Sequence, residues 1–237
     1  MLYKTRGIVL HQVKYDDKKR IITIYTEDFG RCTYIVSNSK KNKITLFRPF
    51  YILDLEVIHK PNARLHKVLE VNVNINFNSI PFDCGKSSIA MFLSEVLYKI
   101  LKEESANKEM FNFIVESIRH LDEKEVNASF FHIIFLIKIA KYFGFFPSGQ
   151  FSEHTPFFDM LEGSFCDTIP HHSHFLNPQK SEIFSNCLSL DFSSSMKISK
   201  IEKNDLLRTI LNFYRIHHES LGEIKSLDVL IAVFLEE

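Results

Sequence analysis

Nine lysines and arginines near the start of the chain are its most distinctive chemical feature. They gather in polar runs between stretches of β-branched and aromatic residues: Lys14, Lys18, Lys19, Arg20, Arg31, Lys40, Lys41, Lys43 and Arg48. Cations at loops can track the phosphates of a nucleic acid, and flat side chains nearby can stack on its bases. Tyr25 and Tyr34 lie among these runs. Strand alternation could turn their rings outward for stacking or bury them in a core, and both possibilities stay open.

The charge is unevenly divided along the chain. Its formal net charge is zero, yet residues 1–80 hold 14 Lys and Arg against 7 Asp and Glu, whereas residues 81–237 hold 15 against 22. A lysine run is usually only a solvated face, but here the positive charge concentrates in one small part of the chain. The asymmetry predicts an N-terminal part that faces a polyanion and a remainder with a different task.

A second group of reactive side chains occupies the later part of the chain: His154, Cys166, His171, His172 and His174. Thiolate and imidazole are ligands that zinc prefers, so a metal-dependent hydrolase is one hypothesis. The HHxH spacing does not match paired zinc ligands, and no signature of a nucleophilic enzyme surrounds the cysteine. We therefore expect packing or surface positions for these side chains, with no bound zinc, no cofactor and no catalytic residue.

The segment DCGKSS at residues 83–88 is similar to the end of a phosphate-binding loop. Ile80 stands where the GxxxxGK[ST] motif requires a glycine, so the pattern fails. The segment instead predicts a polar cap at the start of a helix.

The elements that position these residues follow from the hydrophobic period. Five β-rich runs separated by polar turns cover residues 2–13, 20–26, 31–37, 51–59 and 65–77. Five short strands suit a small closed barrel of the OB type, and an SH3-like barrel fits the count nearly as well. After residue 80 the period changes to about 3.6, which indicates helices. We expect them near 89–101, 110–121, 126–143, 179–190, 202–218 and 226–235.

The predicted fold is α+β in two domains. Residues 1–80 form an OB-fold nucleic-acid-binding domain, and residues 81–237 form an all-α helical domain with an irregular segment at residues 145–178. The apolar helix should end at Gly144, with Pro147 beyond it. The apolar segment of this helix is shorter than the ~18 apolar residues that a membrane span needs. Because the four cysteines include no CxxC pair, we expect a cytoplasmic chain with free thiols and no membrane contact.

Several motifs resemble those of the RecO family of recombination mediator proteins in order and spacing. RGIVL, YDDKKRI, ITIYTEDFG and SNSKKNK stand where that family has a strand ending in GIVL, a YGExDRI turn, a TxxTxExG strand and turn, and a basic loop. RPF, KYFGFFP and HHESLGEIKSLDVL extend the resemblance over most of the chain. Asp16 and Lys19 depart from the family's turn. Only Cys166 remains of four cysteines that bind zinc in many relatives, which makes residues 145–178 a degenerate zinc-finger-like region.

The resemblance implies a non-enzymatic mediator of DNA repair that is associated with the nucleoid. Such a protein would bind single- and double-stranded DNA, anneal complementary strands, pair with the partner RecR and help load RecA. It would receive the acidic, Phe-ended C-terminal tail of single-stranded-DNA-binding protein (SSB) on its helical half. An RNA-binding OB module with a helical interaction domain is the alternative, ahead of the His/Cys metal-dependent hydrolase.

Overall fold

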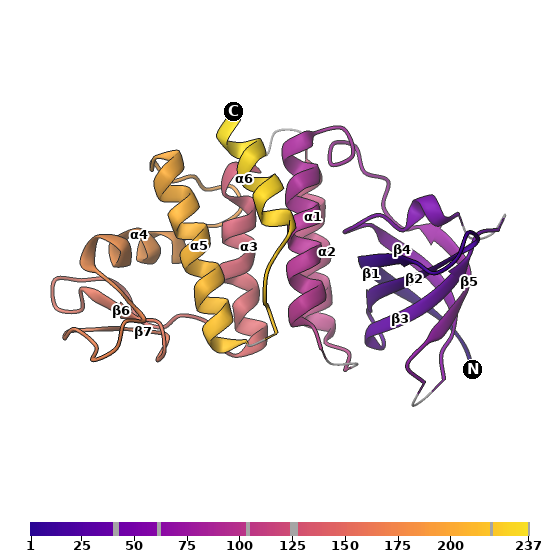
Figure 1. The fold of residues 1–237 in the computed structure, drawn as a ribbon, viewed down its shortest axis with the longest axis horizontal. Coiled ribbons are helices and arrows are strands. Elements are labelled where there is room, and N and C mark those ends of the chain that lie inside the picture. Colours follow the sequence, from indigo (N-terminus) through magenta and orange to yellow (C-terminus); the bar gives the residue numbers. More distant parts are fainter. Residues whose placement is uncertain (40–42, 61–62, 103–104, 124–127, 219, 237) are drawn as a thin grey trace. The chain divides into compact units, whose positions relative to one another are not determined.

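The computed structural model describes residues 1–39, 43–60, 63–102, 105–123, 128–218 and 220–236. Contacts divide the chain into a first unit, Met1–Lys124 with Ile224–Leu230, and a second unit, Glu125–Glu223 with Ile231–Glu237. Figure 1 labels the strands and helices along the chain. This division differs from the predicted domain boundary at residue 80, which stays a prediction. Within the described ranges, no helix has the length and hydropathy to cross a membrane.

The first unit begins with a closed barrel of five strands in the order β1-β2-β3-β5-β4. The strands are β1 (Leu2–Lys14), β2 (Lys19–Thr26), β3 (Gly30–Ser37), β4 (Ile52–Ile58) and β5 (His66–Val73). Four of the five pairings are antiparallel. The closing pair, β3 with β5, is parallel and joins only Tyr34 to His66 and Ile35 to Lys67. The predicted OB-like barrel is confirmed.

Two glycines occupy positions in the barrel where a side chain would be unfavourable. Gly30 has a φ of 64°, so the turn before β3 needs a residue without a Cβ penalty. Gly7 lies where β1 meets the interior, and a Cβ there would come within 2.5 Å of the Ile24 side chain. Interior crowding therefore explains the glycine of the RGIVL motif.

Two capped helices complete most of the first unit. Helix α1 (Cys84–Ile100) starts after Asp83, whose side chain accepts a hydrogen bond from the backbone N–H of Lys86. Helix α2 (Lys108–Asp122) starts after Asn107, which caps it in the same way. The prediction that DCGKSS opens a helix is confirmed.

A buried carboxylate fixes the connection between the barrel and these helices. Asp122 at the end of α2 accepts hydrogen bonds from the backbone N–H groups of Asn78, Ser79 and Ile80 at 2.7, 2.9 and 2.9 Å. The ammonium of Lys86 is buried and donates to the Ser79 hydroxyl at 3.0 Å and to the carbonyl of Glu123. The lysine of the apparent phosphate-binding loop is thus a structural group.

The second unit is built on an apolar helix. Helix α3 (Phe131–Ile139) lies between 3-10 turns at Ala128–Phe130 and Ala140–Phe143, and Gly144 ends the run with a φ of 79°. The α-helical part is shorter than the predicted 126–143, and the first predicted residues lie outside the described ones. Helices α4 (Pro178–Leu188) and α5 (Lys200–His217) follow, and α6 (Ser226–Glu236) begins in the first unit and ends in the second. The Tyr214 hydroxyl donates to the carbonyl of Leu136 at 2.5 Å, which ties α5 to α3.

The segment 145–178 is not irregular throughout, which corrects the prediction. It contains a small antiparallel sheet of β6 (Phe157–Asp159), β7 (Ser164–Cys166) and β8 (Phe175–Leu176), in the order β7-β6-β8. Strands of two or three residues are too short to show a period of two, so the sequence pattern could not reveal them.

We expect Asp122→Ala to destabilise the protein by about 2–4 kcal/mol, because three backbone N–H groups in buried or partly buried hydrogen bonds lose a charged acceptor. Urea unfolding followed by circular dichroism measures this change. Asp167→Ala, at an exposed aspartate, is the matched control and should stay within about 0.5 kcal/mol of the parent. Equal stability of the two variants would show that the network does not hold the connection.

Candidate nucleic-acid interface

Three of the predicted cations meet in one open hollow on the barrel. The hollow has a volume of about 430 Å³ and is lined by Gln12, Lys14, Arg20, Ile44, Thr45 and Arg48. We call these six residues the basic hollow. It contains three cationic side chains, no carboxylate, and the amide and hydroxyl of Gln12 and Thr45. Arginine and lysine side chains bind phosphate oxygens, and neutral polar side chains can donate further hydrogen bonds to the sugar–phosphate backbone of a nucleic acid.

The hairpin of β1 and β2 forms one wall of the basic hollow. Lys14 and Arg20 are direct partners in its register. Asp16, at the position of the family's glycine, accepts a hydrogen bond from the N–H of Lys18 at 2.8 Å. This backbone hydrogen bond is the main cause of a lowered pKa for Asp16. The side chain of Asp16 therefore holds this turn.

The opposite wall is anchored by two buried phenylalanines. Phe47 and Phe50 are 0% and 1% exposed, on either side of Arg48. Phe50 adopts a φ of 66°, rare for a residue with a side chain. Its N–H donates to the carbonyl of Val9 at 2.8 Å, and the N–H of Val9 donates to the carbonyl of Tyr51 at 3.0 Å. These bonds sit where the register of β1 shifts, between Val9 and His11, and they fix the backbone around Arg48.

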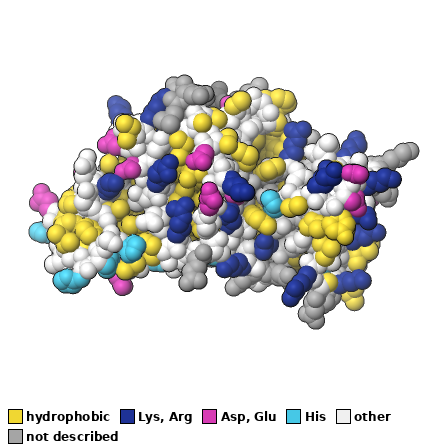
Figure 2. Space-filling model, viewed as in Figure 1, with side chains coloured by type: hydrophobic (Ala, Val, Ile, Leu, Met, Phe, Trp, Pro, Cys, Tyr) yellow, Lys and Arg dark blue, Asp and Glu magenta, His cyan; other side chains and the backbone are white. Residues whose placement is uncertain are grey.

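The cations around the basic hollow are only weakly neutralised. Lys14 pairs with Asp17 at 2.8 Å and Lys19 with Asp16 at 3.8 Å, and both pairs are exposed. Exposed ion pairs of this kind contribute little to stability, so the lysine can readily exchange its carboxylate for another anion. In the described part of the chain, Lys18, Lys43 and Arg48 form no ion pair. Figure 2 shows several Lys and Arg side chains over the barrel on the face in view.

Another hollow of the same barrel has the opposite character. It measures about 360 Å³, and its lining includes Glu27, Asp28, Asp54 and Glu56 beside Lys4 and Arg6. Arg6 is held by two hydrogen bonds to the carboxylate of Glu27, at 2.8 and 3.0 Å, and Lys4 by Glu56 at 2.9 Å. We call this hollow the acidic hollow. Its carboxylates would repel phosphates, so of these two hollows only the basic hollow suits a polyanion.

The structure corrects the stacking role of the two tyrosines. Tyr34 points into the barrel core with Cys32 and Val36 and is 0% exposed. Tyr25 is 1% exposed because α2 covers it: its ring lies 6.1 Å from that of Phe111, and its hydroxyl donates to the carbonyl of Asn107 at 3.3 Å. Neither ring is available to a base.

Arg31 does not line the basic hollow. It lies outward on β3, and its guanidinium packs over the ring of Tyr98 of α1 at 5.1 Å. Lys40 and Lys41 lie outside the described residues. Of the predicted cations, the structure therefore brings together Lys14, Arg20 and Arg48. Lys18 lies in the adjoining turn, Lys19 begins β2, and Lys43 precedes Ile44.

Sequence reasoning missed an apolar groove of the first unit that borders the basic hollow. It measures about 590 Å³ and is lined by Leu10, His11, Gln12, Pro49, Met91, Ser94, Glu95, Tyr98, Lys99, Lys225, Ser226 and Val229. Met91 and Val229 are 36% and 47% exposed. Gln12 lines both this groove and the basic hollow. The residues of the groove come from four separate parts of the chain, so no local pattern signals it.

Hydrogen bonds fix the floor of this apolar groove. The ring of His11 stacks on Tyr98 with centroids 4.3 Å apart, and burial lowers the pKa of His11. Glu95 accepts hydrogen bonds from the backbone N–H groups of Lys225 and Ser226. Burial raises the pKa of Glu95, but these bonds and the Ser226 hydroxyl outweigh it, so its net pKa is lowered. The carboxylate is thus occupied at the start of α6.

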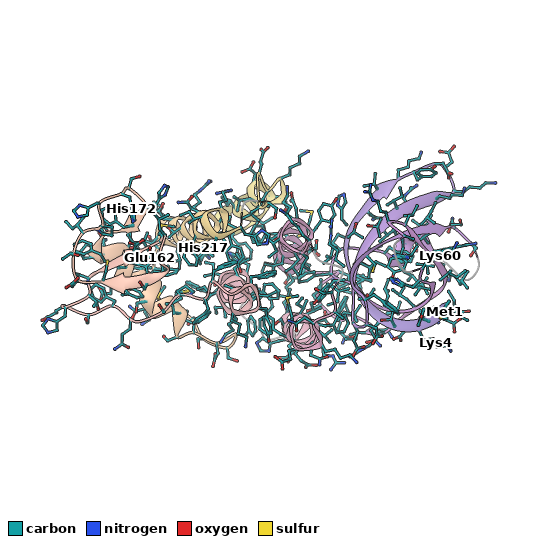
Figure 3. The ribbon with its side chains drawn as sticks, turned by 90° about the horizontal axis from the view of Figure 1, so that it is seen from below. Met1, Lys4, Lys60, Glu162, His172 and His217 are labelled. Carbon is teal, nitrogen blue, oxygen red and sulfur yellow. The ribbon has the colours of Figure 1, made fainter. Side chains whose placement is uncertain are left out.

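The Cys and His residues of the second unit do not assemble as metal ligands. His154, His171 and His174 are exposed. His172 contacts the Asp159 carboxylate at 3.2 Å through Nε2, while its Nδ1 accepts from the N–H of His174 (Figure 3). The Cys166 thiol donates to the carbonyl of Thr168 at 3.3 Å. In the parts of the segment that the structure describes, no three such ligands come together, so the metal-dependent hydrolase has no support here.

Two family models match the chain. The model of the recombination protein O N-terminal domain covers residues 1–76, and that of the C-terminal domain covers residues 81–228. A DNA repair protein RecO from Phocaeicola vulgatus is 36% identical over 99% of this chain and 100% of its own length. Those from Flavobacterium psychrophilum and Bacteroides fragilis are 35% and 33% identical with the same coverage. An asparaginyl-tRNA synthetase from Entamoeba histolytica has 13% identity and a TM-score of 0.27, covering 91% of this chain and 56% of its own.

These full-length matches agree with the barrel, the capped helices and the motifs on β1 to β3. The chain therefore belongs to the RecO family of DNA repair proteins.

Proposed function

We propose that this protein is a non-enzymatic recombination mediator that binds single- and double-stranded DNA through the basic hollow. One observation carries the proposal: Lys14, Arg20 and Arg48 converge in a hollow without carboxylates on a closed barrel. In this role the protein works in the cytoplasm, at the nucleoid.

The mechanism needs charge neutralisation and no activated group. Two complementary strands repel each other through their phosphates, and cations that bind both backbones offset this repulsion. The cations around the basic hollow would hold one strand while its bases remain free to pair, because phosphate contacts carry no base information. Annealing, and loading of RecA together with RecR, would follow from presenting a strand in this way.

We expect Arg48→Glu to weaken binding to oligonucleotides of every sequence and to lower the slope of log affinity against log salt by about 1, because one phosphate contact is lost. Fluorescence anisotropy at several salt concentrations measures both quantities. Lys4→Glu is the matched control: it makes the same charge change on the same barrel, in the acidic hollow, and should leave the slope unchanged. Equal losses in the two variants would mean that only the total charge matters.

Competition between DNA and RNA oligonucleotides of one sequence, measured on the parent protein, separates this proposal from an RNA-binding module. A clear preference for RNA would favour the alternative.

The apolar groove is the site that we propose for the tail of SSB. That tail is acidic and ends in phenylalanine, so it needs an apolar pocket with cations beside it. The groove supplies Met91 and Val229 as exposed apolar surface, and Lys99 and Lys225 as cations. A buried aromatic anchor contributes most of the energy of such a contact, and charges at the rim add less.

A double dissociation tests this division of labour. Met91→Glu places a carboxylate in the apolar groove and should weaken binding of a labelled tail peptide at least tenfold, while DNA affinity changes little. Arg48→Glu should do the reverse, since separate sites are roughly additive. Peptide titration and DNA titration of both variants, with circular dichroism to confirm folding, provide the four values. Parallel losses of peptide and DNA binding in each variant would contradict two separate sites.

A further inference from the structure

Three potential metal ligands that do not line the basic hollow meet inside the barrel. The Sγ atom of Cys32 and one ring nitrogen each of His59 and His66 lie within 4.8 Å of one another. We call these residues the thiol–imidazole cluster. Cys32 and His66 are 2% and 4% exposed, and His59 is half-buried. Across the ranges that the structure describes, no other set of Cys, His, Asp or Glu gathers so closely.

The thiol–imidazole cluster spans the weakest seam of the barrel. Cys32 is on β3, His66 opens β5, and His59 follows β4. The β3–β5 pair is joined by two residue pairs, whereas β2 and β3 are joined by eight. The backbone of Met1 reaches the same end of the barrel, because its ammonium donates to the carbonyl of His59 at 3.0 Å. Figure 3 labels Met1 and Lys60 at this end.

A buried hydroxyl, that of Tyr34, lies beside the thiol–imidazole cluster. Tyr34 is 0% exposed, and no described group lies in hydrogen-bond geometry with its hydroxyl. Its ring is 5.6 Å from that of His66. A buried hydroxyl normally has an acceptor, and a thiolate at Cys32 would provide one.

We propose that Cys32, His59 and His66 bind a zinc ion that clips β3 to β5 and to the end of β4. Thiolate and neutral imidazole are the ligands that zinc prefers, and they account for three of its four tetrahedral positions. Water takes the fourth position on the half-buried side of His59. On binding, Cys32 gives its thiol proton to solvent, and no electron is transferred. The Tyr34 hydroxyl then donates to the zinc-bound sulfur, as outer groups of zinc sites commonly do.

Metal binding requires a small rearrangement. Zinc-bound sulfur and nitrogen atoms lie about 3.5 Å apart, so the ligand atoms must close from their present separations. The Nδ1 atom of His66 now accepts a hydrogen bond from the N–H of Lys60 at 3.3 Å. Ligation through either ring nitrogen ends this bond, because zinc replaces the donor at Nδ1 or the ring proton moves there. The bond is long and therefore weak, and zinc would replace it with a stronger link between the same segments.

The sequence predicted a chain without zinc because it offered only the residues 154–174 as neighbouring ligands. The thiol–imidazole cluster involves none of them. Cys166 is therefore a suitable control: it is a half-buried thiol on a strand of the second unit.

The test uses the full chain, stripped of metal by a chelator under reducing conditions. Titration with Co²⁺ should give one ion per chain, with the charge-transfer absorption of a thiolate–cobalt bond. Zn²⁺ at a free concentration a hundred times its Kd should raise Tm by about 5–10 °C. Cys32→Ser should lose the absorption and the rise in Tm, whereas Cys166→Ser should keep both.

If Cys32→Ser does not fold, His59→Ala replaces it, because the half-buried His59 tolerates truncation better, and it should lose the rise in Tm. The proposal is overturned if no thiolate absorption forms at one equivalent of Co²⁺, or if Zn²⁺ leaves Tm unchanged. It is also overturned if the signals survive in the cluster variants or disappear in Cys166→Ser.

Discussion

Two backbone hydrogen bonds between Val9 and the segment Phe50–Tyr51 fix the backbone that carries Arg48 at the basic hollow. They hold the connection between β3 and β4 against β1 at the point where its register shifts. Phe47 and Phe50 are buried on either side of Arg48, so the arginine projects from a fixed backbone. Lys14 and Arg20 are placed opposite by the register of the hairpin. A long, flexible side chain loses less entropy on binding when its backbone is already held.

The charges of the barrel show why a net charge of zero is compatible with binding a polyanion. Carboxylates gather in the acidic hollow, where they hold Arg6 and Lys4 in ion pairs. The basic hollow contains none. The local field, and not the total charge, attracts phosphates at distances shorter than the Debye length. The apolar groove beside it carries Lys99 and Lys225 and offers a different kind of surface, apolar with cations at its margin.

Local patterns predicted what local forces determine. The five strands, the helix start at residues 83–88 and the helix end at Gly144 follow from spacing and residue type, and all are present. Tyr25 could not be assigned, because its burial depends on Phe111 of α2, far along the chain. The sequence grouped Arg31 with the other predicted cations. Its guanidinium packs over the ring of Tyr98 of α1, and no local pattern reveals a contact so far along the chain.

The thiol–imidazole cluster was invisible in the sequence because barrel closure brings β3 beside β5. The three ligands have no common spacing, and only the shared end of the barrel unites them. The short strands β6, β7 and β8 lacked enough residues to show a period. The thiol–imidazole cluster was therefore missed because of a long-range contact, and the strands were missed because of their length.

Lysine footprinting tests most directly the claim that the basic hollow contacts nucleic acid. The native protein is acetylated with and without a single-stranded oligonucleotide, and the modification of each lysine is measured by mass spectrometry. The account predicts that Lys14, Lys18, Lys19 and Lys43 become protected, whereas Lys4, Lys108 and Lys180, which are exposed elsewhere, react as in the free protein. Protection centred on Lys4, Lys108 or Lys180, or equal protection of all seven, would contradict it.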